Sequence, residues 1–355
     1  MGTRLGRLRD EMKCRGLDAM LITCPVNQSW ACDFDFEDGY LLVCSERAYL
    51  ITDPRYIEAA RAEADGAFLC ECAPPDLSEM ICSYLSDNRA RTVGIEDMEL
   101  SYYDTMRFKG ALSEYEIVPT GSMLDDLRAK KDEDEIEKMI EAQRITDAAF
   151  SHILGYIREG VTERDIAIEL EFFMRRQGAS GVSFDIICAS GTASSRPHAA
   201  ARAVPIERGF LTIDMGCIYS GYCSDMTRTV VFGSADEKMK ALYDTVLGAQ
   251  RAALDYITDG VRCADVDRVA REITEREYPS LFSHSLGHGV GRRIHESPRL
   301  SLRAGDKRLS RGHVVTVEPG IYIEGVYGCR IEDVVVIGEG RADNITASTK
   351  ELIEL

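Results

Sequence analysis

The sequence predicts an α/β domain over residues 1–124, followed by an α+β domain over residues 125–355 that is built from two related halves. Three observations lead to this fold class. The chain has 355 residues and a mass of 39.5 kDa, which exceeds the usual size of one hydrophobic core. Strand-like and helical segments alternate through the first part of the chain. In the second part, one segment recurs a hundred residues later.

The composition excludes two classes of partner. The net charge is −18, and binding to nucleic acid depends on Lys and Arg side chains that neutralise phosphates. Polyanions are therefore poor partners for this chain. No apolar run approaches the roughly 20 residues that span a bilayer, so no membrane partner is expected. Peptides and small molecules remain as ligands.

The cysteines and the first residues predict a cytoplasmic protein. The twelve cysteines are scattered along the chain without a CxxC pair, which favours reduced thiols over disulfides or a zinc ribbon. Leu5, Leu8 and Met12 lie at helical spacing, and the segment lacks the continuous apolar core of a secretory signal. A myristoylation signal has glycine at position 2 and Ser or Thr at position 6. This chain has Gly2 but carries Gly6 instead, so no lipid anchor is expected.

The first domain is expected to alternate strands with helices. Apolar runs bounded by turn residues predict the strands, namely AMLIT (19–23), GYLLVCS (39–45), RAYLITD (47–53), TVGIED (92–97) and YEIVP (115–119). The intervening helices are expected near 54–64, 76–88 and 101–111. After a turn-like PTGSM, the charged stretch DDLRAKKDEDEIEKMIEAQR is expected to open one long helix. This places the domain boundary near residue 124.

The second domain contains a weak internal repeat. YIREGVTERDI (156–166) matches YITDGVRCADV (256–266) at five positions that carry Tyr, Ile, Gly, Val and Asp. Both copies lie between helical stretches and precede strand-rich segments, which indicates two halves related by a pseudo-twofold axis. The alternative is coincidence, because connectors between helices often contain Gly and Asp. A site at the interface of the two halves would follow from a duplication.

Each half contains a predicted hairpin with a carboxylate on both arms. Asp214 and Asp225 are equidistant from a turn near Tyr219 and Ser220, so the two side chains are expected to share a face. Glu318 and Glu332 are likewise equidistant from Gly325. Unpaired buried charges cost several kcal/mol, and metal ions would compensate them.

The predicted cluster suits two divalent cations. Four carboxylates supply the charge that two such ions would balance, and the imidazole of His288 could complete the ligand set. Oxygen-rich ligation favours manganese, although such sites also accept cobalt, zinc or iron. The alternative is that each acidic residue is a turn residue or faces solvent. That alternative is the better one for any single residue but not for all four.

Several linked motifs carry a resemblance to a known family. IDMG, SDMTRT, HSLGHGVG with HE, VEPG and RIEDVVVI follow one another in this order. This set resembles the pita-bread metallopeptidases, specifically the Xaa-Pro aminopeptidase and prolidase branch. The N-terminal domain also resembles the companion domain of that branch and of creatinase. There NQSWACDF departs from the usual loop sequence, which leaves open whether Trp30 contacts the pocket.

The resemblance implies a dinuclear metal centre and an exopeptidase. Its five ligands would be Asp214, Asp225, His288, Glu318 and Glu332. In such hydrolysis the two ions hold a bridging hydroxide, orient it against the scissile carbonyl and stabilise the tetrahedral intermediate. Glu318 would also accept the proton of the attacking water. The substrates implied are short peptides with proline at the second position, and the resemblance also implies a homodimer.

The remaining histidines and one arginine receive separate roles from the resemblance. His295 matches a histidine that donates a hydrogen bond to the developing oxyanion, and His198 matches one that contacts substrate. His284 matches a residue that lines the pocket, and Arg330 one that supports the proline-specific site. His152 and His313 are interpreted as structural.

Two other motifs are rejected for the segment around His288. A zincin HExxH helix starting at His284 would need Glu at position 285, where the chain has Ser. GHGVGR resembles a dinucleotide-binding loop, but Arg292 stands where the third glycine belongs. The glycines of this segment also favour a strand or loop over a helix.

Two function classes remain after these assignments. The first is a metal-dependent Xaa-Pro exopeptidase, and the second is a relative without peptidase activity, such as a creatinase-like hydrolase or a binding protein. The complete ligand set favours the peptidase, because four converging carboxylates would destabilise a fold that binds no metal. Methionine aminopeptidase is a nearer alternative, but it commonly lacks the companion domain. The sequence does not decide whether the enzyme is a dipeptidase or an aminopeptidase. It also leaves open whether Arg299 binds a substrate carboxylate or faces solvent.

Overall fold

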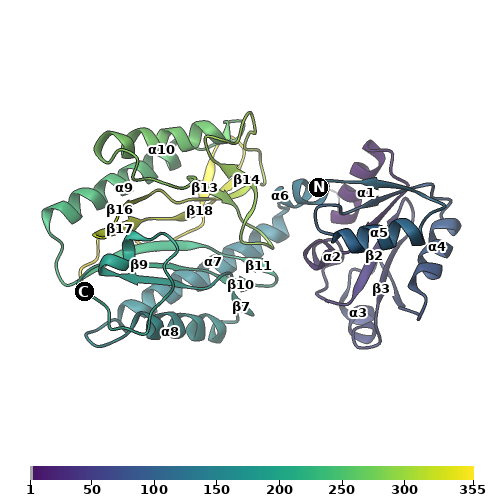
Figure 1. Cartoon of the computed structure of the whole chain (residues 1–355), viewed down its shortest axis with the longest axis horizontal. Helices are drawn as coiled ribbons and strands as arrows, with labels where there is room; N and C mark the ends of the chain where they lie inside the picture. Colours follow the sequence, from purple (N-terminus) through teal and green to yellow (C-terminus); the bar gives the residue numbers. More distant parts are fainter. Residues whose placement is uncertain (1–2) are drawn as a thin grey trace. The chain divides into compact units, whose positions relative to one another are not determined.

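The computed structural model describes residues 3–355, so Gly2 and the question of an anchor there lie outside the described residues. The chain forms two compact units, Met1–Arg128 and Ala129–Leu355, which Figure 1 shows in the colours of the sequence. Each unit is described by itself. Within residues 3–355, no helix combines the length and the apolar character that crossing a membrane requires.

The first unit contains a six-stranded sheet in the order β4-β3-β2-β1-β5-β6. The β1–β2 and β2–β3 pairs are antiparallel and the other neighbours are parallel. The strands are β1 (Ala19–Ile22), β2 (Gly39–Cys44), β3 (Ala48–Thr52), β4 (Leu69–Cys72), β5 (Thr92–Ile95) and β6 (Glu116–Pro119). The helices are α1 (Arg4–Cys14), α2 (Pro25–Cys32), α3 (Ile57–Glu63), α4 (Leu77–Asp87) and α5 (Tyr102–Ala111).

The predicted elements of this unit are all present, and two further elements were not predicted. Helix α1 buries Leu5, Leu8 and Met12, as their spacing predicts. Helix α2 begins at Pro25, which is a favoured first helical residue because its fixed φ suits the helix. This helix buries Trp30 completely within the core of the first unit. Strand β4 was missed because its residues are mostly half-exposed and show no clear alternation.

The prediction of one long helix after residue 124 is wrong. The chain forms α6 (Met123–Ala129) and then α7 (Glu133–Leu154). Between them the backbone N–H of Lys131 donates to the carbonyl of Gly312 at 2.8 Å, which an uninterrupted helix would not allow. Asp132 then begins α7 through a reciprocal capping box with Glu135. A short non-helical connector, residues 130–132, therefore precedes α7.

The second unit contains two sets of strands. The first half holds β8 (Ile187–Ser190), β9 (Gly209–Met215) and β12 (Met226–Phe232) in the order β12-β9-β8, with a small sheet of β7 (Gly181–Val182), β10 (Cys217–Tyr219) and β11 (Tyr222–Cys223). The second half holds a sheet in the order β14-β13-β15-β18-β19 and the hairpin β16–β17. Its strands are β13 (Gly287–Gly289), β14 (Glu296–Leu300), β15 (Val314–Val317), β16 (Gly320–Ile323), β17 (Tyr327–Arg330), β18 (Asp333–Ile337) and β19 (Ala342–Asn344).

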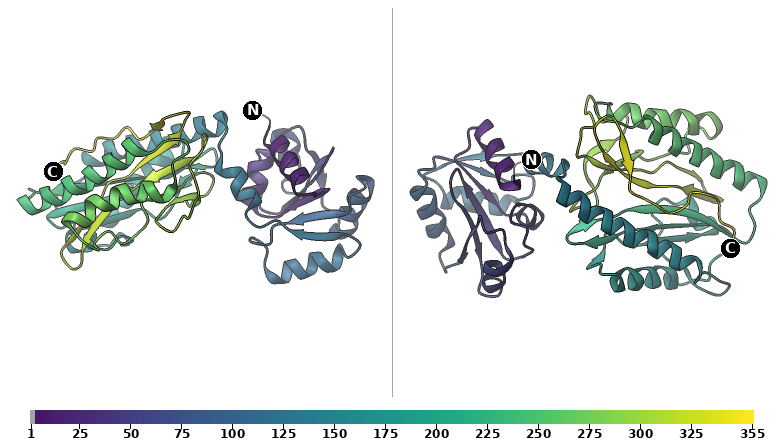
Figure 2. Two further views of the ribbon diagram at one scale, coloured as in Figure 1. Left: turned by 90° about the horizontal axis from the view of Figure 1, so that it is seen from above. Right: turned by 180° about the vertical axis from the view of Figure 1, so that it is seen from behind.

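The internal duplication is visible in the helices and their connectors. Helices α7 and α8 (Glu163–Arg176) belong to the first half, and α9 (Glu237–Tyr256) and α10 (Cys263–Glu277) to the second. Figures 1 and 2 show the strands of this unit lying between the two helix pairs. Gly160 and Gly260 adopt positive φ values of 86° and 83° at equivalent places. Two residues after each glycine, the chain forms an equivalent isolated β-bridge, between Thr162 and Pro205 in the first half and between Arg262 and Arg308 in the second.

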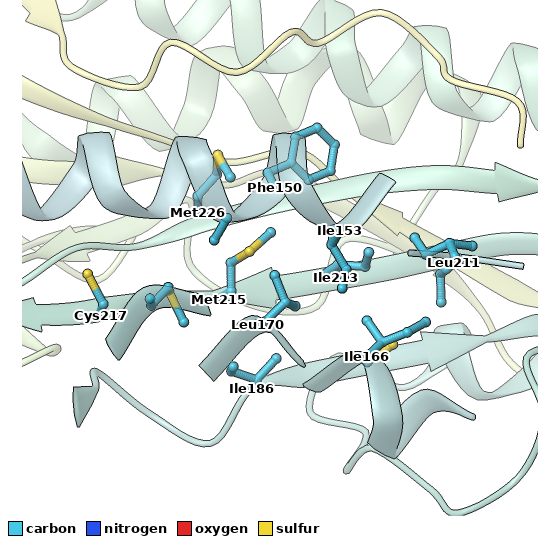
Figure 3. Close-up of a cluster of buried hydrophobic side chains, with 14 of the residues drawn as sticks. Phe150, Ile153, Ile166, Leu170, Ile186, Leu211, Ile213, Met215, Cys217 and Met226 are labelled. Carbon is cyan, nitrogen blue, oxygen red and sulfur yellow. The ribbon is translucent and has the colours of Figure 1, made fainter. Parts of the chain in front are cut away.

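An apolar core joins the helices of the first half to its sheet. Phe150 and Ile153 of α7 and Leu170 of α8 pack against Leu211 and Ile213 of β9 (Figure 3). All five side chains are buried, and each contributes about 1.5–3 kcal/mol relative to exposure. This core fixes β9, and with it Asp214, against the helices.

The sheets of the two halves meet along a polar seam rather than a continuous strand ladder. At this seam the N–H of Glu332 donates to the carbonyl of Thr227 at 3.1 Å, and the Thr227 hydroxyl donates to the Glu332 carboxylate at 2.8 Å. The buried Arg228 guanidinium forms an ion pair with Asp333 at 2.8 Å and also donates to the Glu332 carbonyl. The seam therefore passes through one of the predicted metal ligands.

A buried carboxylate in α8 gives a stability prediction. The side chain of Glu163 is fully buried. Its carboxylate accepts hydrogen bonds from the backbone N–H and from the side chain of Ser190, and likewise from the backbone N–H and the side chain of Arg202. We expect Glu163→Gln to lower the free energy of unfolding by about 2 kcal/mol, because the partly exposed Arg202 loses its counter-charge and the donors around the buried side chain lose an acceptor. Urea unfolding of the metal-free protein measures this, with the exposed Glu159→Gln as control.

The same carboxylate predicts a pH dependence. Burial alone would raise the pKa of Glu163, but hydrogen bonds from Arg202 and Ser190 outweigh burial and hold this pKa below its usual 4.5. The stabilisation is therefore fully present above pH about 4.5 and is lost as the pH falls through the folded-state value. The difference between wild type and Glu163→Gln should shrink in acid, and a difference that is constant with pH would contradict the prediction.

Candidate metal centre and its cavity

The first predicted hairpin is present, but its register differs from the prediction by two residues. The turn is at Ser220 and Gly221, both with positive φ, as a two-residue hairpin turn of type I′ requires. Asp214 therefore lies opposite Thr227, not opposite Asp225. Because side chains alternate with a period of two, a shift by two residues keeps Asp225 on the same face as Asp214.

The second hairpin has the predicted register. Gly320 pairs with Arg330 in β16–β17, and Val317 pairs with Asp333 in β15–β18. Glu318 and Glu332 occupy the positions between these two ladders, symmetrically about the loop at Gly325. Glu318 and Glu332 therefore lie directly opposite each other on neighbouring segments of the chain.

One cavity of about 810 Å³ collects the predicted site residues of the second unit. Its apolar wall includes Phe184, Ile186 and Ile294. Its polar lining includes Asp214, Asp225, His288, Glu318 and Glu332, together with His198, His284, His295, Arg299 and Arg330. Both halves contribute to this lining, as the predicted duplication requires.

The five predicted ligands approach one another in the cavity. Asp225, His288 and Glu332 each offer one ligand atom, and these three atoms lie within 4.8 Å of one another. His288 Nε2 is 3.6 Å from Asp225 Oδ2 and 3.5 Å from a Glu318 carboxylate oxygen. Asp214 Oδ2 accepts a hydrogen bond from Arg330 Nη2 at 2.7 Å. Its other oxygen, Oδ1, is buried and has no hydrogen-bond partner among the described residues.

Burial and mutual repulsion perturb the carboxylates. Burial raises the pKa of Asp225 well above its usual value, and the neighbouring Asp214 and Glu318 raise it further. Burial and Asp225 raise the pKa of Glu332 in the same way. The pKa of Glu318 rises to about 8, again chiefly through burial. A cation among these groups would remove the repulsion that causes part of these shifts.

His288 is suited to act as a neutral ligand. Burial lowers the pKa of His288 to about 3, and the nearby His295 contributes to the shift. Its Nδ1 lies 3.1 Å from the carbonyl of Gly289 and its Nε2 faces the carboxylates. A neutral imidazole held by its other nitrogen is the usual form of a metal-binding histidine. The donor set of four carboxylates and one imidazole, with an unsatisfied Asp214 oxygen, therefore fits divalent metal ions.

The other predicted residues surround this cluster. The His295 ring lies edge-on to His288, with 4.4 Å between ring centroids, and its exposed side chain faces the cavity together with that of His198. Burial lowers the pKa of His284 to about 4, so this ring is neutral at pH 7. Arg330 is buried and bonds Asp214 and Thr227.

Two polar residues of the site were not predicted. Tyr322 is buried beside the cluster, where its hydroxyl accepts from Arg330 Nη1 at 2.6 Å and lies 3.1 Å from His284 Nε2. Thr316 accepts from the His288 N–H and donates to Glu318 at 3.4 Å. Thr316 lies two residues before Glu318, a spacing that places both side chains on one face of an extended chain and that the sequence contains. Nothing in the local sequence distinguishes Tyr322 from a core tyrosine.

The structure also places Arg299, whose role the sequence left open, and the two histidines interpreted as structural. Arg299 lines the cavity and is exposed. His152 pairs with Glu169 at 2.7 Å on the surface of α7 and α8, and the His313 ring bonds Ser310. Neither lines the cavity, in agreement with their structural interpretation.

The segment around His288 is a strand, as its glycines predict, and not a helix or a dinucleotide loop. A Cβ at Gly287 would lie 2.0 Å from the carbonyl oxygen of Thr316, and one at Gly289 would lie 2.2 Å from that of Ser297. The glycines are therefore explained by close packing between neighbouring strands.

Comparison with known proteins identifies relatives along most of the chain. Residues 137–339 match metallopeptidase family M24, and residues 4–130 match the creatinase/prolidase N-terminal domain. The uncharacterized peptidase YqhT of Bacillus subtilis is 39% identical over 99% of this chain and 100% of its own length.

Two solved structures show the same fold. The Xaa-Pro dipeptidase from Bacillus anthracis has a TM-score of 0.95 and 39% identity, and the match covers 99% of both chains. The X-Pro aminopeptidase from Thermotoga maritima has a TM-score of 0.91 and 35% identity, and the match covers 98% of this chain and 100% of that one. The expected pita-bread catalytic domain with a creatinase-like N-terminal domain is thereby confirmed. The chain is a hydrolase that belongs to metallopeptidase family M24.

Proposed function

We propose that this protein is an Xaa-Pro exopeptidase, which hydrolyses the bond between an N-terminal residue and proline in short peptides. The observation that carries the proposal is the single cavity in which the five metal-ligand candidates meet His198, His284, His295 and Arg330. The names of the two solved relatives, an Xaa-Pro dipeptidase and an X-Pro aminopeptidase, support the same substrate class.

The proposed cofactor is a pair of divalent metal ions, with manganese favoured by the oxygen-rich donors. The residues that would hold them are Asp214, Asp225, His288, Glu318 and Glu332. When bound, such ions activate a water molecule at neutral pH and polarise the scissile carbonyl. The cavity residues around them then bind the peptide, move protons and stabilise charge.

Proton transfer and charge stabilisation are assigned to two residues. Glu318 lies at the cavity wall, where its carboxylate accepts the proton of the attacking water and passes it to the leaving proline nitrogen. His295 donates a hydrogen bond to the carbonyl oxygen as negative charge develops on it. His198, exposed on the same cavity lining, contacts the peptide.

Recognition of the peptide is assigned to the walls of the cavity. The neutral His284, held beside the Tyr322 hydroxyl, lines the subsite for the proline ring. Arg330 fixes both Tyr322 and Asp214, so it supports this subsite from behind. The free amino group of the substrate would lie near the metal ions, which accounts for cleavage at the N-terminus.

Product analysis by mass spectrometry tests the proposal. Chelator-stripped protein is incubated with manganese and with either Ala-Pro or Ala-Pro-Ala. Metal-dependent release of alanine is expected, and the preferred peptide decides between dipeptidase and aminopeptidase. Absence of cleavage with manganese, cobalt, zinc or iron would reject the proposed function. The predicted homodimer is tested by light scattering of the same preparation.

A further inference from the structure

A buried ion pair connects the residues before α7 with strand β14. Lys131 Nζ lies 2.9 Å from Glu296 Oε2, and the two side chains are 1% and 2% exposed. Burying both charges costs several kcal/mol per ion before their attraction is counted, so such a pair contributes little net stability compared with apolar side chains. Its location indicates another use, because Glu296 directly follows His295 in the chain.

The carboxylate of Glu296 holds the turn that carries His295. Oε1 accepts a hydrogen bond from the backbone N–H of Arg293 at 3.1 Å, while Oε2 accepts from Lys131. A Cβ at Gly291 would lie 2.4 Å from Glu296 Oε2 and 2.9 Å from Lys131 Cε. The turn of residues 291–295 therefore packs directly onto the ion pair.

The lysine end of the pair is itself fixed. The N–H of Lys131 donates to the carbonyl of Gly312, and Lys130 forms an isolated bridge with His313. Asp132, the next residue, caps α7. The ammonium group thus extends from a connector that is fastened on both sides, which makes it a firm anchor for Glu296.

We propose that Lys131 is a positioning residue that holds His295 in its catalytic orientation through Glu296. The inference rests on the proposed function to the extent that His295 acts on the substrate there. Lys131 itself does not line the cavity. Its effect on turnover passes through the Glu296 carboxylate and the backbone of the turn.

Kinetics of Lys131→Met test the proposal, because methionine keeps the length of the side chain and removes its charge. On an Xaa-Pro peptide, kcat should fall roughly 10- to 100-fold, as expected for a displaced catalytic group, while KM and metal content stay unchanged. Lys131→Arg keeps the cation and should recover part of kcat. Leu85→Ala, in the apolar core of the first unit, is the control for a general loss of stability.

A double-mutant cycle separates positioning from a general structural effect. If Lys131 acts through His295, Lys131→Met should change kcat very little in a His295→Ala background. Full additivity of the two losses would overturn the proposal.

A readout independent of activity keeps the test distinct from that of the proposed function. The protein has six histidines, so NMR of ¹⁵N-labelled imidazoles can resolve His295, with His295→Ala for assignment. Lys131→Met should shift or broaden the His295 resonances, whereas Leu85→Ala should not. Unchanged His295 resonances in Lys131→Met would reject the positioning role even if the peptidase activity is confirmed. Shifted resonances would support it even if the wild type cleaves no Xaa-Pro peptide.

Discussion

Replacing Asp225 by Asn is expected to abolish turnover and, at the same time, to stabilise the metal-free protein. Ligand atoms of Asp225, His288 and Glu332 lie within 4.8 Å of one another, so loss of the Asp225 carboxylate should remove bound metal and several kcal/mol of transition-state stabilisation. Since 1.36 kcal/mol corresponds to tenfold in rate, kcat/KM should fall about a thousandfold or more. Peptide hydrolysis and metal content by mass spectrometry measure both effects.

The opposite effect on stability follows from the raised pKa of Asp225. Burial and the neighbouring carboxylates raise this pKa above its usual 3.8, so the folded protein binds more protons than the unfolded chain above that pH. The metal-free wild type should therefore lose stability as the pH rises from about 4 toward neutrality. Asp225→Asn should weaken this loss and raise the apoprotein Tm at pH 7.

The control for Asp225→Asn is the same substitution at Asp306, whose side chain is 97% exposed. Asp306→Asn should leave metal content, turnover and Tm nearly unchanged. A metal-free Asp225→Asn protein that is less stable than the metal-free wild type would contradict the electrostatic argument. It would show that Asp225 is needed for packing rather than for charge.

His295→Ala is expected to have the second largest effect. A single donor to a developing oxyanion contributes roughly a hundred- to a thousandfold to kcat, and His295, which lies beside His288 on the cavity lining, is the residue proposed for this role. KM should change little, because the hydrogen bond strengthens only as charge develops. Steady-state kinetics of a manganese-loaded enzyme on an Xaa-Pro dipeptide measure both constants.

His152→Ala is the matched control for His295→Ala. It removes the same ring from the surface of α7, where the ring pairs with Glu169, and should leave kcat within a factor of about two. An increase in KM with unchanged kcat in His295→Ala would instead assign His295 to substrate binding. Lost metal in His295→Ala would mean that the ring supports His288 and is not itself a donor.

The two hairpins show how far the sequence determines the site. In the second, alternation is symmetrical about one loop glycine, Gly325, and the register follows from it. In the first, the turn at Ser220 and Gly221 displaces the pairing by two residues. A shift by two residues changes the cross-strand partner of Asp225 but not the face on which its side chain lies. Asp225 therefore still lies close to His288 and Glu332, although its predicted cross-strand neighbour was wrong.

Features that depend on contacts between residues far apart in the chain could not be predicted from the sequence. The charged residues after Leu124 have high helix propensity, and the break at Lys131 arises from a hydrogen bond to Gly312. The local signal of that break was the capping pair Asp132 and Glu135. Tyr322 carries no such signal, because its role depends on a contact with His284, which is 38 residues away in the chain.

The polar seam between the two sheets has a consequence for the lifetime of the protein. Few backbone hydrogen bonds cross the seam at Thr227 and Glu332, so the halves are held together chiefly by side chains, such as the buried Tyr222 and Val314. Ions held by Asp214 of one half and His288 of the other would act as a cross-link there. The kinetic stability of the enzyme, and with it resistance to proteolysis, would then rise and fall with the metal supply.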